Sequence, residues 1–121
     1  MKILHVEDTP EISQVFADIL SSKNYDFDSV SDGRAGLELA VCKDYDLILL
    51  DMCMPKYSGA DFLIDLKSRR PSELSKVVIV SALEMNALQE QQLLDFGIRS
   101  ILKKPISVQT LLSQIEQEIT F

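Results

Sequence analysis

The chain has 121 residues, with 46% hydrophobic and 26% charged side chains, which fits a single globular domain over residues 1–121 with a substantial core. Its 12 basic and 19 acidic residues leave a net charge of −7, which argues against direct binding of nucleic acid or of an anionic membrane. No apolar run is long enough to cross a bilayer, and the start MKILHVED is no secretory signal, so we expect a cytoplasmic protein. Cys42 and Cys53 lack metal-ligand spacing, and in the cytoplasm their thiols are expected to be reduced.

Strand and helix patterns alternate in the first half of the chain. KILHV predicts a buried strand over residues 2–7, and Thr9 followed by Pro10 predicts the start of a helix. This helix repeats apolar residues at the spacing of one face, Ile12, Val15, Phe16, Ile19 and Leu20. DFDSVS alternates like a strand near the sheet edge, residues 33–43 carry a second helical pattern, and DLILL predicts a fully buried strand.

The second half of the chain continues the alternation. Ser58 and Asp61 resemble a capping box and predict a third helix, after which the polar segment 68–76 is predicted to be a loop. VVIV predicts a buried strand, followed by a helix over residues 84–96 that Gly97 ends. SILK predicts a short fifth strand. The last helix is predicted from a cap and one apolar face, formed by Ser107, Val108, Leu111, Leu112, Ile115 and Ile119.

Five strands alternating with five helices predict an α/β fold, in which a doubly wound parallel sheet is covered on both faces. In such sheets, ligands bind beyond the carboxyl ends of the strands, where the strand order reverses. The first strand ends in Glu7 and Asp8, and the third ends in Asp51. In a five-stranded sheet of order 2-1-3-4-5 these two strands are neighbours, so their ends lie roughly 5 Å apart.

Three carboxylates brought together in this way need a proton or a cation. Two unit charges at about 4 Å repel by roughly 4 kcal/mol at an effective dielectric constant near 20. A site made of oxygen ligands alone suits Mg²⁺. Helix capping is the simpler alternative and is enough to explain Asp8. It does not require acids at the ends of both central strands, so we favour the cation.

Two further strand ends add a hydroxyl group, from Ser81, and an ammonium group, from Lys103 or Lys104. Neighbouring strand residues point to opposite faces, so only one of the two lysines is expected to enter the site. A hydroxyl, an ammonium and a divalent cation together bind the oxygens of a phosphoryl group. A carboxylate such as Asp51 can act as the nucleophile that accepts it.

In their order along the chain, these motifs resemble the receiver domain of two-component response regulators, and the resemblance covers the whole sequence. VED at 6–8 resembles the family's acidic pair, and DMCMPKYSG matches its D-x-x-M-P-x-x-x-G motif from Asp51 to Gly59. SA at 81–82 matches its Ser/Thr-Ala, and KP at 104–105 matches its Lys-Pro. The resemblance implies the flavodoxin-like fold of single-domain, chemotaxis-type receivers.

The resemblance also implies a reaction. Asp51 is the expected phosphoacceptor and takes its phosphoryl group from a sensor histidine kinase or a phosphotransfer protein. Ser81 is expected to donate a hydrogen bond to that group, and Lys104 to pair with it. The bond between Lys104 and Pro105 is expected to be cis.

For the metal, the resemblance implies Mg²⁺ bound directly by Asp8 and Asp51, by Glu7 mainly through water, and by the backbone carbonyl of Cys53. The sequence departs from the family three residues before the lysine, where an aromatic side chain is common and this chain has Ile101. With little side-chain volume to swing inward, the switch is expected to act through backbone shifts of residues 82–90.

The expected function is a phosphorylation-controlled switch, not an enzyme. Because 121 residues leave no room for an output domain, the output is expected to be a contact with a downstream protein or a phosphorelay step, unless the chain is an excised part of something larger. One alternative is a small phosphohydrolase with an aspartate nucleophile, but the haloacid dehalogenase type has a second Asp where this chain has Cys53. A flavin carrier needs a phosphate-binding loop that Glu7 and Asp8 would repel. The remaining alternative is a receiver-like scaffold that is never phosphorylated.

Other polar and sulfur-containing residues are assigned to structure. His5 is expected in the core, Arg69 and Arg70 at a solvated helix end and not in a docking patch, and Met52 and Met54 in the packing of their loop. Neutral glutamines line the last two predicted helices, with few charge pairs to hold a symmetric dimer. We therefore expect the protein to be mostly monomeric.

Overall fold

The computed structural model describes residues 2–82, 84–104 and 108–119. Within them, one parallel sheet has the strand order β2-β1-β3-β4-β5, which confirms the predicted topology. The strands are β1 (Lys2–Val6), β2 (Asp26–Val30), β3 (Leu47–Leu50), β4 (Val77–Ser81) and β5 (Ser100–Lys103).

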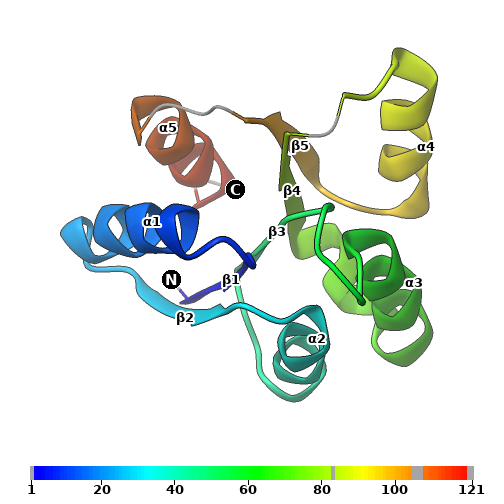
Figure 1. The fold of residues 1–121 in the computed structure, drawn as a ribbon, viewed down its shortest axis with the longest axis horizontal. Coiled ribbons are helices and arrows are strands. Elements are labelled where there is room, and N and C mark those ends of the chain that lie inside the picture. The colour runs from blue at the N-terminus through cyan, green and yellow to red at the C-terminus, as the bar shows by residue number, and fades with distance from the viewer. Residues whose placement is uncertain (1, 83, 105–107, 120–121) are drawn as a thin grey trace.

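Helices cover both faces of this sheet (Figure 1). One layer contains α1 (Pro10–Ser22) and α5 (Val108–Ile119), and the other contains α2 (Gly33–Cys42), α3 (Gly59–Arg69) and α4 (Ala87–Phe96). Each layer has its own core, because alternate strand residues point to opposite faces. Ile3, Leu47 and Leu49 pack with α1 and α5, whereas Leu4 and Ile48 pack with α2 and α3.

Helix ends follow the local signals in part. The side chain of Ser58 accepts a hydrogen bond from the Asp61 amide, and the Asp61 carboxylate accepts one from the Ser58 amide, which confirms the predicted capping box. Gly97 ends α4 with φ of 123°, as predicted. The predicted start of α4 at residue 84 was wrong, because Asn86 and Gln89 form a second capping box that starts the helix at Ala87.

One residue of the predicted apolar face of α1 is not buried. Val15 of α1 is 50% exposed, although Phe16, Ile19 and Leu20 on the same predicted face are buried. A helix resting on a sheet buries a narrower stripe than its full apolar face, and Val15 lies outside that stripe. In α5, Leu111 and Ile115 are buried as predicted. The predictions for Ser107 and for the side chains of Val108 and Ile119 lie outside the described residues.

The segment 68–76, predicted to be a polar loop, is structured. It completes α3 and continues as a 3₁₀ helix, η1 (Pro71–Lys76). Glu73 is buried there, with its carboxylate 3.2 Å from Arg70 and 2.8 Å from Lys76. Arg70 also donates to the carbonyl of Lys43 at 2.8 Å. Arg69 pairs with Glu38 of α2 at 2.6 Å, so the two arginines fasten α3 to the region around α2 and do not form a free helix end.

Candidate functional site

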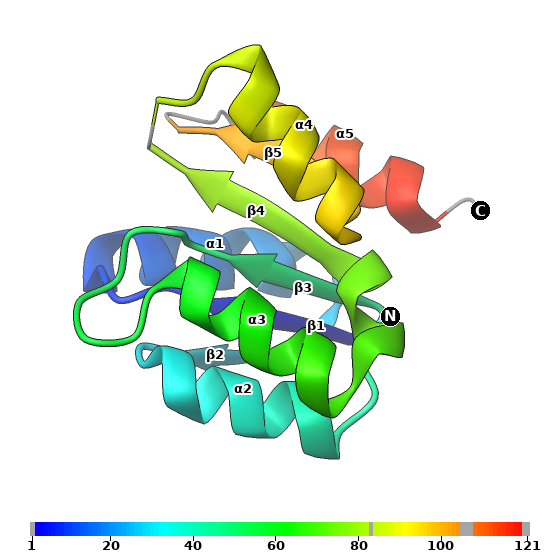
Figure 2. The same cartoon turned by 90° about the vertical axis from the view of Figure 1, so that its right-hand side faces the viewer.

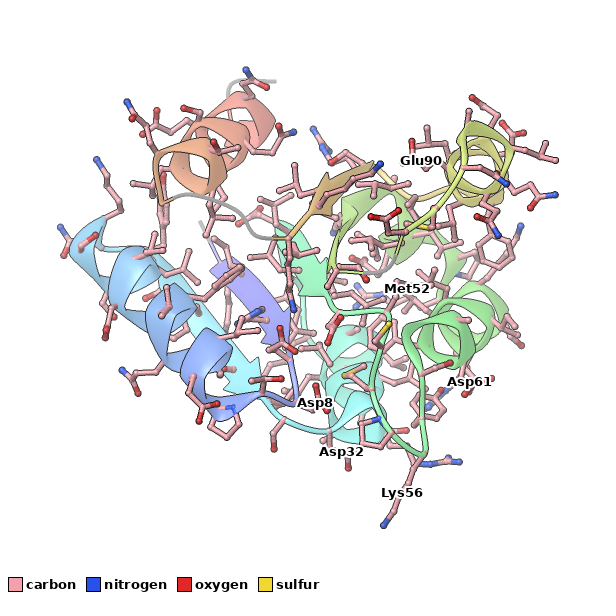
Figure 3. All side chains as sticks on the ribbon, turned by 45° about the horizontal axis from the view of Figure 1, so that its top comes forward. Asp8, Asp32, Met52, Lys56, Asp61 and Glu90 are labelled. Atoms are coloured by element: carbon pink, nitrogen blue, oxygen red, sulfur yellow. The ribbon has the colours of Figure 1, made fainter. Side chains whose placement is uncertain are left out.

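The predicted acidic residues meet at the carboxyl end of β1 and β3. Val6 and Leu50 are paired in register, so the residues that follow them leave the sheet side by side. Glu7, Asp8 and Asp51 each offer an oxygen within 4.8 Å of the others. Glu7 and Asp51 are only 1% and 6% exposed, and Figure 3 shows Asp8 at the end of β1, on the same side of the sheet as the loop that begins at Met52.

Among the described residues, one lysine faces this cluster. The ammonium nitrogen of Lys104 lies 2.5 Å from Glu7 Oε1 and 3.9 Å from Asp51 Oδ1, and the Lys104 side chain is only 14% exposed. Lys103 points the other way, is 62% exposed and pairs with Glu90 at 3.0 Å. The prediction that one lysine enters the site is therefore confirmed, and strand alternation is the reason.

Negative charge exceeds positive charge at the site. Burial, together with the neighbouring Asp51, raises the pKa of Glu7 to about 7, although Lys104 opposes the shift. The second carboxylate oxygen of Glu7, Oε2, is buried and has no hydrogen-bond partner among the described residues. Three oxygen donors, one of them unpaired, with a single ammonium group fit a hard divalent cation such as Mg²⁺.

The hydroxyl predicted at the end of β4 is also in place. Leu50 pairs with Ile79, so Ser81 lies one residue beyond the level of Asp51 on the neighbouring strand. Ser81 is 1% exposed, and its carbonyl accepts a hydrogen bond from the Lys104 amide at 2.9 Å. This bond ties β4 to the end of β5 at the point where the lysine enters the site.

The loop after Asp51 closes over the edge of the sheet. The Cys53 amide donates to Asp51 Oδ1 at 3.2 Å, and the Gly59 amide donates to the Met52 carbonyl at 3.1 Å. Met54 is buried, as predicted, and Cys53 is exposed. The loop therefore brings the backbone of Cys53 next to the acidic cluster while its thiol faces solvent.

His5 lies behind the site in the α1 layer. It is 3% exposed, and its ring stacks on Phe16 with centroids 4.4 Å apart. Burial and the nearby charge of Lys104 lower the pKa of His5 to about 4. It is therefore a neutral core residue, as predicted.

Residues 3–116 match the response regulator receiver domain family. The chain belongs to this family. It is 32% identical to the response regulator ArlR of Staphylococcus saprophyticus, over 94% of this chain and 50% of that protein. It is 34% identical to the transcriptional regulatory protein HprR of Escherichia coli, over 98% of this chain and 52% of that protein. This receiver domain thus spans about half the length of the curated relatives it matches.

The receiver domain of a sensor histidine kinase from Pseudomonas aeruginosa, solved with magnesium coordinated in its active-site cleft, has the same fold. Its TM-score is 0.82 at 27% identity, and the match covers 99% of this chain and 98% of that one. Receiver domains bind Mg²⁺ in the active site and interact with histidine kinases or phosphotransfer proteins. The acidic cluster of this receiver domain has the donor set that such a site requires.

Some predictions fall on other positions. Ile101 is partly buried and packs against the core on the α2 and α3 side. Pro105 lies outside the described residues, so the expected cis bond stays a prediction. Sequence reasoning missed Tyr57, a buried residue in the loop after Asp51 whose hydroxyl donates to Asp65. The one sequence feature that could have predicted its burial is a large aromatic side chain within a short turn.

No helix in the described part of the chain combines the length and the apolar character needed to cross a membrane.

Proposed function

We propose that this receiver domain accepts a phosphoryl group on Asp51 from a histidine kinase or a phosphotransfer protein. The observation that carries the proposal is the convergence of Glu7, Asp8 and Asp51 with Lys104 at the edge of the sheet, on neighbouring strands. A helix-capping role would not bring a buried lysine and a buried carboxylate to the same point.

The reaction uses the Asp51 carboxylate as the nucleophile. One of its oxygens attacks the phosphorus of a phosphohistidine, a P–O bond forms, and the P–N bond breaks. The leaving imidazole nitrogen keeps the electron pair and takes up a proton. The Cys53 amide, which already donates to Asp51 Oδ1 at 3.2 Å, orients the carboxylate.

Two side chains would then hold the transferred group. Lys104, now 3.9 Å from Asp51 Oδ1, pairs with a phosphoryl oxygen. Ser81 donates its hydroxyl hydrogen to another oxygen. Because Ser81 leads directly into the segment before α4, this new bond biases the backbone there.

The metal ligands in this proposal are Asp8, Asp51 and the backbone carbonyl of Cys53, with Glu7 acting mainly through water. When bound, Mg²⁺ supplies positive charge that offsets the charge on the phosphoryl oxygens. The buried, unpaired oxygen of Glu7 supports a role for this residue in the same site.

The chain acts in this proposal as a switch and not as an enzyme. A phosphohydrolase of the haloacid dehalogenase type would need an acid or base at the position of Cys53, which has only an exposed thiol. A scaffold that is never phosphorylated would have no need for excess buried charge. The output is a contact with a downstream protein or a phosphorelay step, made in the cytoplasm by a mostly monomeric protein.

The test is incubation with acetyl phosphate and Mg²⁺, followed by intact-mass analysis. The wild type and Asp26→Asn, which changes an exposed carboxylate at the opposite end of the sheet, should form one phosphoryl adduct. Asp51→Asn should reduce the adduct at least about 100-fold. An undiminished adduct on Asp51→Asn would show that the acceptor is another residue.

A further inference from the structure

Tyr57 lies in the loop after Asp51, yet its side chain belongs to the helix layer. It is 4% exposed and packs between the start of α2 and the first turns of α3. Its hydroxyl donates to the carboxylate of Asp65 and lies 3.4 Å from the carbonyl oxygen of Asp61. Burial and the bond to Asp65 raise the pKa of Tyr57, so the hydroxyl remains a donor throughout the physiological range.

Residues at the start of α2 also contact the Tyr57 ring. The guanidinium carbon of Arg34 lies 4.6 Å from the ring centre, a cation–π distance. At Gly33, an added Cβ would lie 2.8 Å from the Tyr57 carbonyl oxygen and 2.9 Å from the ring. Glycine is needed there because the loop backbone approaches α2 so closely.

The loop backbone adopts a locally unfavourable conformation. Lys56 has φ of 67°, a left-handed conformation that costs a residue with a side chain about 1 kcal/mol. The Tyr57 amide closes a tight turn onto the Pro55 carbonyl at 2.7 Å. In Figure 3 the loop descends from Met52 to an outward-pointing Lys56 and returns toward Asp61. The contacts made by Tyr57 offset this local cost.

We propose that Tyr57 is a positioning residue for the metal site, and that its bond to Asp65 holds the loop so that the Cys53 backbone faces the acidic cluster. This rests on the proposed function, because the Cys53 carbonyl serves as a ligand only if Mg²⁺ binds there. Residues that orient metal ligands typically change metal affinity by about 10- to 100-fold.

The chain contains a matched control in Tyr45. Its side chain is 2% exposed, and its hydroxyl donates to Asp28 at 2.6 Å, so Tyr45→Phe removes a similar buried tyrosine–carboxylate bond. Tyr45 precedes β3, whereas the acidic cluster lies at the opposite, carboxyl end of β1 and β3. Tyr57→Phe and Tyr45→Phe should therefore lower the stability of the metal-free protein alike, but only Tyr57→Phe should weaken Mg²⁺ affinity, by about tenfold.

The experiment titrates Mg²⁺ against the melting temperature of the wild type and both variants. Amide hydrogen exchange of residues 52–58 is measured without Mg²⁺, and should be faster in Tyr57→Phe alone. Asp65→Asn keeps an oxygen acceptor for the tyrosine and should retain most of the Mg²⁺ affinity. Asp65→Ala should match Tyr57→Phe, and the double variant should be no worse than either single one, because both remove the same bond.

Equal Mg²⁺ affinity in Tyr57→Phe and Tyr45→Phe would overturn the inference. So would unchanged exchange of residues 52–58 in Tyr57→Phe. Failure of the proposed function has a different signature: the wild type would show no stabilisation by Mg²⁺, or Asp8→Ala would keep all of it. That result would remove the metal role of Tyr57, while the exchange data would still decide whether Tyr57 anchors the loop.

Discussion

Two segments leave the sheet at the same edge and are held very differently. The segment after β3 leads into α3, which buries Phe62, Leu63 and Leu66. The segment after β4 leads into α4, in which no residue is buried. Both helices begin with a complete capping box, so local hydrogen bonding at the helix start is equivalent. The difference lies in tertiary packing.

The space between the two helices shows the same contrast. A cavity of about 360 Å³ lies between α3 and α4, and its apolar lining includes Leu63, Ile64 and Phe96. Leu88 and Leu94 of α4 are 67% and 40% exposed. In Figure 2, α3 lies along the sheet next to α2, whereas α4 lies apart from them, in front of β5 at the other edge of the sheet. A helix with so little buried area opens at low cost in free energy.

This division matches the two tasks in the proposed switch. Metal binding gains from a loop fixed in advance, since no free energy is then spent on ordering it. A response gains from an element with two states of similar free energy, because a phosphoryl group shifts the equilibrium only by its differential interaction with them. The segment from Asp51 through α3, here called the anchored side, carries the phosphoacceptor. The segment from Ser81 through α4, here called the loosely packed side, carries the response.

The largest expected effect comes from breaking the anchored side. At Gly59 an added Cβ would lie 2.6 Å from the Met52 Cα and 2.8 Å from the Asp51 carbonyl oxygen, so Gly59→Ala forces backbone atoms apart. We expect a loss of roughly 2–3 kcal/mol in the free energy of unfolding. Leu88→Ala on α4 should cost less than about 0.5 kcal/mol. Urea denaturation measures both, and comparable losses would contradict the contrast.

Hydrogen exchange sharpens the comparison without a substitution. Amides within α4 should exchange at least about tenfold faster than those in the middle of α3, because α4 opens locally while α3 opens with the core. Adding Mg²⁺ should protect residues 52–58 and leave α4 unchanged. A beryllofluoride mimic of the phosphoryl group should alter α4 as well. Equal protection of the two helices in the metal-free protein would count against a loosely held α4.

The smallest expected effect is the pH dependence of stability that arises from Glu7. Glu7 has a pKa of about 7 in the folded protein, above its ordinary value near 4.5, so the folded state retains a proton that the unfolded state releases between these values. Stability from protonated Glu7 is therefore fully present below about pH 4.5 and is lost as the pH rises through 7.

Glu7→Gln removes this dependence. Without Mg²⁺ it should be more stable than the wild type at pH 8, by about 1 kcal/mol after discounting the screening by Lys104 and solvent. The gap should close toward pH 5. Thermal melts at fixed ionic strength measure the difference in stability. His5, whose pKa is lowered, changes the stability with pH in the opposite direction, but it is present in both proteins and cancels in the comparison. A gap that is independent of pH would mean that Glu7 is ionised throughout.

Much of this protein follows from sequence alone, because the deciding interactions are local. Apolar runs specify the buried strands, Ser58 and Asp61 start α3 through their own hydrogen bonds, and Gly97 ends α4 through its backbone freedom. The site acids were also predictable. Parallel strands bring their carboxyl ends to one edge, so acids placed directly after two central strands must meet there.

Tertiary structure decided the features that depend on partners distant in sequence. Polarity predicted a loop where Glu73 is buried, because only folding brings Arg70 and Lys76 around its carboxylate. Nothing near Tyr57 in the sequence reveals that Gly33 leaves room for its ring, since those residues meet only when α2 and α3 pack together. The helix α4 also contains several leucines, yet none of its residues is buried, and a cavity lies between it and α3. Local patterns thus determined the order and approximate position of the strands and α-helices, while contacts across the sheet and between helices determined which of them are held firmly.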